Sequence, residues 1–97
     1  MEKALALKAL ADDTRLKIVI HLLGHSYCVR SLAKELGISE AAVSQHLKIL
    51  REAGLLTGEK QGYFMHYHVN REALRKLADD INALADIQYH KNGDIQS

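Results

Sequence analysis

The chain has 97 residues, a formal net charge of +1 and 47% hydrophobic residues, which suits one small globular domain. Its apolar runs are too short to span a bilayer, and its N-terminus lacks the apolar segment of a secretory signal. Its single cysteine, Cys28, excludes an intrachain disulfide and fits a reducing compartment. We therefore expect one domain over residues 1–97, a cytoplasmic location and no membrane partner.

Two helices are predicted before residue 25. The first covers residues 2–11. Asp12 or Asp13 can cap the second, because a short carboxylate accepts the unpaired N–H groups of a first turn. Gly24 is expected to end it in the left-handed conformation. Apolar spacing assigns the inward faces: Leu5, Leu7, Ala9, Leu10 and Ala11 in the first helix, and Leu16, Val19, Ile20 and Leu23 in the second.

A helix-turn-helix is predicted over residues 29–54. Its first helix begins near Val29 and ends at Gly37. Ser39 is a suitable N-cap for its second helix, which ends at Gly54. Two short helices joined by a tight glycine turn are typical of this motif. The apolar residues of the second helix are expected to point inward: Val43, Leu47 and Leu50.

A β-hairpin is predicted over residues 55–69. A strand over residues 55–57 precedes a polar turn over residues 58–62, and residues 63–69 have the alternating pattern of a return strand. Asn70 can then cap a last helix over residues 70–90. The expected fold class is mainly α with a β-hairpin wing: a winged helix-turn-helix with five helices that forms a dimer.

The last helix has a longer apolar stripe than a terminal helix of a small domain needs. Because domains of this size often gain buried area by dimerising, we interpret the stripe as a dimer face shared with the first helix. Its expected members are Leu7, Leu74, Leu77, Ile81 and Leu84. In the alternative, the stripe binds another protein and the chain is a protein-interaction module without specific DNA binding.

The helix after Ser39 has the outward face of a helix that binds in a DNA groove. Gln45 can form a bidentate pair with adenine, and Ser44 can bond several bases. Cations further along the helix and at the wing tip suit phosphates. An ordinary solvated helix has the same periodicity, but the order of the elements favours double-stranded DNA. The predicted DNA-binding set is Ser39, Ala41, Ser44, Gln45, His46, Lys48, Arg51 and Lys60.

Three side chains form a candidate metal site. If the second helix continued past Gly24, His21, His25 and Cys28 would share one face, and they would suit a transition metal such as zinc or nickel. In the competing interpretation the helix ends at Gly24 and Cys28 only packs. Cys28 as a redox sensor would need a partner from another subunit.

Two further hypotheses concern the wing and catalysis. His66 and His68 share a strand face and either chelate a metal or pack along the wing. The sequence has neither a glycine-rich phosphate loop nor paired catalytic carboxylates, so we do not expect an enzyme.

Three stretches of the sequence are characteristic: residues 7–16, residues 31–33 and above all residues 43–55, VSQHLKILREAGL. On these stretches the chain resembles the ArsR/SmtB family of dimeric repressors. The resemblance implies a five-helix winged fold, dimerisation through the first and last helices, and repression from an inverted-repeat operator. Many members release DNA when an effector binds. For this chain the resemblance implies a metal ion, a thiol oxidant or a small molecule as the effector.

The resemblance also bears on individual residues. It places Ser44, Gln45 and His46 where the family's DNA-contacting residues lie. Cys28 and Val29 fall where metal sensors of the family often have Cys-Val-Cys, but Arg30 replaces the second thiolate. That departure argues against a soft-metal site of this type.

Overall fold

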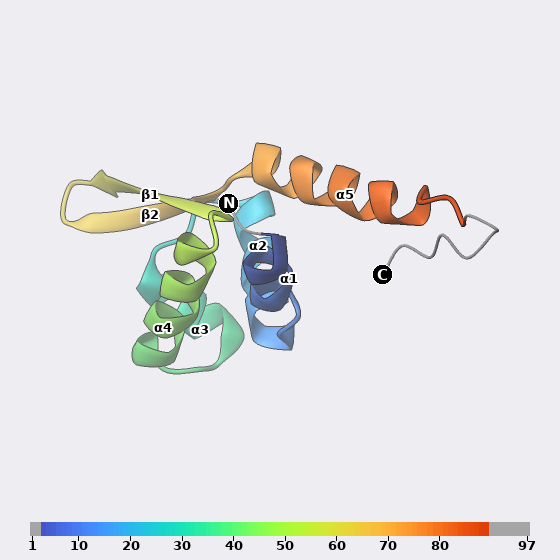
Figure 1. Cartoon of the computed structure of the whole chain (residues 1–97). Helices are drawn as coiled ribbons and strands as arrows, with labels where there is room; N and C mark the ends of the chain where they lie inside the picture. The colour runs from blue at the N-terminus through green and yellow to red at the C-terminus, as the bar shows by residue number, and fades with distance from the viewer. Residues whose placement is uncertain (1–2, 90–97) are drawn as a thin grey trace.

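The computed structural model describes residues 3–89 and has the predicted five helices and one hairpin (Figure 1). The helices α1–α4 form a body from which the hairpin projects on one side and α5 on the other, giving an elongated shape of 62 × 22 × 20 Å. This arrangement confirms the winged helix-turn-helix. None of the described helices has the length and apolarity needed to cross a bilayer. The elements are α1 (Lys3–Leu10), α2 (Asp13–Gly24), α3 (Val29–Leu36), α4 (Glu40–Glu52), β1 (Leu56–Gln61), β2 (Phe64–Val69) and α5 (Arg71–Ala85).

Side-chain caps and glycines set most of the helix boundaries. The side chains of Asp12, Ser39 and Asn70 each accept a hydrogen bond from the backbone N–H three residues later, at 3.0, 3.1 and 3.1 Å. They satisfy donors that have no partner within the helix. Gly37 and Gly54 follow α3 and α4 with φ angles of 68° and 77°. These findings confirm the predicted caps and select Asp12 over its neighbour.

The end of α2 differs from the prediction. Gly24 is still helical, and it is not among the described glycines with positive φ. The helix ends because His25 is extended, with φ −148° and ψ 160°. The N–H of His25 still donates to the carbonyl of His21 at 3.0 Å. The chain therefore leaves the helix axis at His25, and the residues after it do not continue the face of α2.

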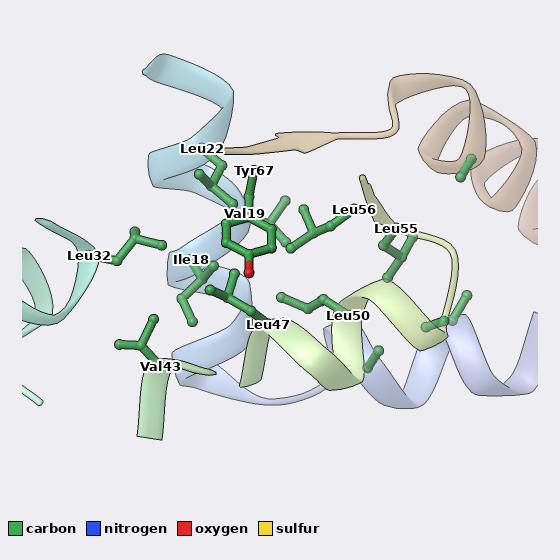
Figure 2. Close-up of a cluster of buried hydrophobic side chains, with 14 of the residues drawn as sticks. Ile18, Val19, Leu22, Leu32, Val43, Leu47, Leu50, Leu55, Leu56 and Tyr67 are labelled. Carbon is green, nitrogen blue, oxygen red and sulfur yellow. The ribbon is translucent and has the colours of Figure 1, made fainter. Parts of the chain in front are cut away.

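The core lies where α2, α3 and α4 meet beneath the base of the hairpin (Figure 2). Tyr67 of β2 is 7% exposed and packs within this cluster. The inward face of α4 is confirmed. The largest fully buried side chains are Ile18, Leu32, Val43, Leu47, Leu50 and Leu55.

The predicted inward face of α1 is confirmed for Ala9 and for Leu10, which packs against the core, but was wrong for Leu5 and Leu7. Ala6 and Ala9 are 0% and 1% exposed, whereas Leu5 and Leu7 are 42% and 41% exposed. Alanine has no long side chain, so a helix that faces inward through alanines can approach its neighbours closely. Consequently α1 directs two leucines to the surface.

The predicted inward face of α2 is likewise confirmed only for Val19 and for Leu23, which packs against the core. Its buried residues are Ile18, Val19 and Leu22. Leu16 and Ile20 are 45% and 57% exposed. Both stripes have helical spacing, so periodicity alone did not distinguish them.

The hairpin is longer than predicted and its turn is tighter. The strands pair antiparallel from Leu56 opposite Val69 to Gln61 opposite Phe64. The turn therefore consists of Gly62 and Tyr63, where the φ of 64° at Gly62 favours glycine. Residues 58–61, predicted as turn, belong to β1.

The hairpin is attached to the body at its base. Tyr27 forms an isolated antiparallel bridge with Tyr67, in which the Tyr67 N–H donates to the Tyr27 carbonyl at 3.4 Å. The segment before α3 thus lies along the outer edge of β2. This contact positions the wing relative to the helix-turn-helix.

Candidate nucleic-acid interface

The packing of α4 determines which of its side chains face solvent. Val43, Leu47 and Leu50 are 0%, 1% and 0% exposed, and they fix the rotation of the helix about its axis. Ser39 caps the helix, so its hydroxyl already accepts from the Ala42 N–H. Five of the predicted DNA-binding residues are exposed along the opposite side: Ala41, Ser44, Gln45, Lys48 and Arg51.

The cations of α4 and β1 that were predicted to bind DNA have no carboxylate partner in the part of the chain that the structure describes. No carboxylate of residues 3–89 forms an ion pair with Lys48, Arg51 or Lys60. Lys60 is exposed on β1 opposite Met65 rather than in the turn. Unpaired cations on one surface are the groups that contact phosphates.

His46 lies apart from the outward set. Its side chain is half-buried, and its Nδ1 is 3.3 Å from Nη1 of Arg15 on α2. The same guanidinium donates through Nε to the carbonyl of Ala9, at the end of α1, at 2.8 Å. The ring of His46 is thus directed toward α1 and α2, whereas the side chains of Ser44 and Gln45 are exposed to solvent.

The predicted dimer residues separate into buried and exposed groups. Leu77 is 3% exposed and is covered by its own chain, and Leu74 is partly buried against the core. Leu7, Ile81 and Leu84 are 41%, 46% and 61% exposed. The second half of α5 extends beyond the body, where no described element covers it (Figure 1).

Two further exposed apolar residues were not assigned to the dimer face from the sequence. Ile87 is 63% exposed just after α5, and its spacing of three from Leu84 could have identified it. Leu5 is 42% exposed on α1. It was assigned to the inward face.

The candidate metal site is not assembled. The His21 Nδ1–H donates to the Lys17 carbonyl at 2.8 Å, whereas the ring of His25 lies edge-on to that of Tyr27 at 6.0 Å between centroids. The extended backbone at His25 removes the common helical face on which the prediction depended. Among residues 3–89, no three His, Cys, Asp or Glu side chains are grouped so as to hold a metal ion.

Cys28 has a structural environment of its own. It precedes α3, and its Sγ lies 3.4 Å from the hydroxyl of Ser31, which lowers the pKa of the Cys28 thiol. A hydrogen bond to the thiolate favours the ionised form. Cys28 is the single cysteine in the chain, so no second thiol of the same chain can form a disulfide with it.

The wing histidines connect parts of the chain. Nδ1 of His66 lies 2.9 Å from the Ser26 hydroxyl, which ties β2 to the segment before α3. Nε2 of His68 lies 3.7 Å from the carboxylate of Glu59 on the paired strand. Each histidine therefore has a separate partner.

Comparison with known proteins places these features in a family. Residues 12–57 match the model of the bacterial regulatory protein, arsR family. The transcriptional repressor SdpR of Bacillus subtilis is 35% identical over 88 residues, covering 91% of this chain and 94% of the relative. The repressor SmtB of Mycobacterium tuberculosis is 44% identical over 73 residues, covering 75% of this chain. The chain spans about half of that relative, 48% of its length.

Solved structures give the same result. An ArsR-like transcriptional regulator from Rhodococcus sp. RHA1 superimposes with a TM-score of 0.80 at 30% identity, covering 86% of this chain and 78% of the other. A homodimeric winged helix-turn-helix DNA-binding domain from Mycobacterium bovis superimposes with a TM-score of 0.71 at 26% identity, covering 90% and 85%. The chain therefore belongs to the ArsR family of bacterial regulatory proteins.

Proposed function

We propose that the chain is a sequence-specific DNA-binding protein that represses transcription as a homodimer. The observation that carries the proposal is α4, whose buried side is fixed in the core and whose exposed side combines small, amide and basic residues. The relatives from Bacillus subtilis and Mycobacterium tuberculosis are both named as transcriptional repressors. The family is one of transcriptional regulators rather than enzymes.

The residues of α4 have different proposed roles. Ala41 allows close approach of the helix to the major groove, and Ser44 and Gln45 face base edges there. Lys48 and Arg51 contact phosphates, which set the position and much of the affinity. Two residues outside the helix, Ser39 at its N-cap and Lys60 on the wing, complete the phosphate contacts.

A second copy of the chain is the proposed partner of the exposed apolar surface. Leu7, Ile81 and Leu84 belong to it, and Leu5 and Ile87 extend it. The related Mycobacterium bovis domain is described as homodimeric. Because two-fold symmetry presents two copies of α4 in opposite directions, the preferred DNA is an inverted repeat.

Release by an effector is part of the proposal, but a metal site within residues 3–89 is not. A relative in Escherichia coli, 48% identical over 65 residues, is named an arsenical resistance operon repressor. However, the side chains of His21, His25 and Cys28 do not form a ligand set. These three donor groups, as they are placed within residues 3–89, therefore do not fit a bound metal.

Selection of bound duplexes from a random DNA pool tests the proposal. We expect an enriched inverted repeat, and we expect Gln45→Ala to weaken binding to it by about 1–3 kcal/mol while relaxing the sequence preference. Gln88→Ala, at an exposed residue after α5, is the matched control and should bind normally. Absence of an enriched sequence would refute the proposal, and an equal loss on all DNA would remove Gln45 from the base contacts.

A further inference from the structure

A hollow lies between β2 and the start of α3, next to the point where the segment before α3 is bridged to β2. Tyr27 is bridged to Tyr67 at the edge of β2. The chain then turns into α3 at Val29, while β2 extends back to Phe64. The space has a volume of about 330 Å³, within the range of about 300–1,000 Å³ for small-molecule sites. It is lined by Cys28, Arg30, Ser31, Lys34, Phe64 and His66.

One wall of the hollow is an exposed aromatic ring. Phe64, the only phenylalanine in the chain, is 55% exposed. A second hollow, of about 370 Å³, shares Cys28, Arg30 and Phe64 with the first. A flat apolar molecule placed against Phe64 would remove apolar surface of both partners from water, which is favourable.

The other wall carries two exposed cations, whose apolar stems line the hollow and whose charged ends lie at its mouth. Arg30 and Lys34 are four residues apart, so they project from the same side of α3. Neither forms an ion pair within residues 3–89, and no carboxylate lines the 330 Å³ hollow. The second hollow, in contrast, includes Glu40. An anionic group is therefore favoured at the mouth of the first hollow, whereas in the second hollow Glu40 opposes the charge of Arg30.

We propose that the hollow between β2 and α3 binds a small organic anion of the aromatic carboxylate class, with its ring against Phe64 and its carboxylate between Arg30 and Lys34. The two walls belong to the wing and to the first helix of the helix-turn-helix. A ligand between them changes the angle at which the wing meets DNA. This effector role rests on the proposed function, whereas the binding itself does not.

Binding is measured on the full chain with 1-naphthoate as the probe and without DNA. Alkylation of Cys28 by neutral iodoacetamide, followed by mass spectrometry, reports occupancy, because this thiol lines the hollow and its lowered pKa favours the reactive thiolate. We expect 1-naphthoate to protect Cys28 from alkylation in a saturable manner. In NMR spectra we expect it to change the amide chemical shifts of residues 28–34 and 64–66. The uncharged analogue 1-naphthalenemethanol should bind about tenfold more weakly, because it lacks the charge-assisted hydrogen bonds.

Two pairs of variants locate the site. Arg30→Gln and Phe64→Ala should each weaken 1-naphthoate binding about tenfold. The matched controls Lys17→Gln and Ile20→Ala alter exposed residues of α2 and should bind the probe normally. Phe64 is exposed, so its replacement leaves the fold intact, as circular dichroism will verify.

Three results would overturn the site: no protection of Cys28 by the acid, equal protection by the alcohol, or unaltered binding in both Arg30→Gln and Phe64→Ala. Because no DNA is present, failure of the repressor proposal cannot produce any of them. A parallel DNA titration with 1-naphthoate tests the effector role, which an unchanged DNA affinity would overturn.

Discussion

Single residues connect helices that are distant in sequence, and Arg15 is the main example. Its backbone N–H donates to the Asp12 carboxylate, its Nε donates to the Ala9 carbonyl, and its Nη1 lies within hydrogen-bond distance of Nδ1 of His46. The side chain therefore ties the end of α1 and the start of α2 to α4. We infer that it positions the DNA-contacting helix against the helix of the proposed dimer face.

Replacement of this guanidinium should destabilise the fold. In Arg15→Lys the charge remains but the planar set of donors is lost, and hydrogen bonds of charged groups each contribute about 1.5–3 kcal/mol. We expect the free energy of unfolding to fall by about 1–3 kcal/mol in urea titrations. Lys17→Gln, in the next turn of α2, is the control. An Arg15→Lys midpoint equal to that of the control would refute this role.

The cap at Asp12 makes part of the stability dependent on pH. The Asp12 carboxylate accepts a hydrogen bond from the Arg15 backbone N–H, and this bond lowers the pKa of the carboxyl below 3.8. A depressed pKa in the folded state contributes stability above the ordinary Asp range, and that contribution is lost as the pH falls through the folded value.

Asp12→Ala should therefore be less stable than the parent at neutral pH, and the difference should shrink in acid. Urea titrations from pH 7 to about pH 2 check this expectation. Asp13→Ala is the matched control, because Asp13 pairs only with exposed Lys17. If the stability difference between Asp12→Ala and the parent is the same at every pH tested, the Asp12 carboxylate is not the source of the pH dependence.

The residue scale also shows what the sequence could and could not predict. The cap at Ser39 and the buried stripe of α4 depend on neighbours within one or two turns, so local spacing was sufficient. His46 was predicted to face DNA, yet its ring meets Arg15, 31 positions away. Local spacing contains no information about such a partner.

At the level of elements, prediction succeeded for the caps of α2, α4 and α5 and for the inward face of α4, and it failed in part at the end of α2 and on the inward faces of α1 and α2. The sequence of α1 alternates alanine and leucine, KALALKAL, so several faces are apolar and only contact with the other helices selects the alanines. The polar residues 58–61 suggested a turn, but cross-strand pairing with residues 64–67 includes them in β1. Glycines mark the ends of α3 and α4 more reliably, because their backbone angles are local.

Two glycine substitutions should have opposite effects on stability. Gly37 has a φ of 68°, and an added Cβ meets no atom within 4 Å, so Gly37→Ala should cost about 1–2 kcal/mol through backbone strain alone. Gly24 is helical and equally unobstructed, so Gly24→Ala should stabilise by up to about 1 kcal/mol. Thermal unfolding measures both changes. The same sign for both would show that backbone conformation does not govern these sites.

At the level of the whole molecule, the distribution of apolar surface is more informative than its amount. The sequence identified α5 as longer than its own domain requires, but it did not show that Leu77 is covered within the chain. Which turn of α5 leaves the body depends on the tertiary arrangement (Figure 1). The proposed dimer face is accordingly limited to the second half of α5 and the outer side of α1.

A charge placed on that face should separate the subunits. Leu84 is 61% exposed, so Leu84→Lys leaves the single chain folded but buries an unpaired ammonium in the dimer, which is strongly unfavourable. We expect sedimentation velocity to show a monomer at micromolar concentration. Tyr63→Lys, at the 98% exposed wing tip, is the control and should remain dimeric. A Leu84→Lys protein that also remains dimeric would place the interface elsewhere.

The bridge between Tyr27 and Tyr67 makes the wing a lever. It attaches the hairpin to the body near one end, while Gly62 and Tyr63 form the far end. The displacement of a rigid lever grows with distance from its fulcrum, so a small rotation at Tyr67 moves Tyr63 much more than it moves His66. Any such rotation would therefore alter contacts made by the tip while α4, anchored separately in the core, keeps its place.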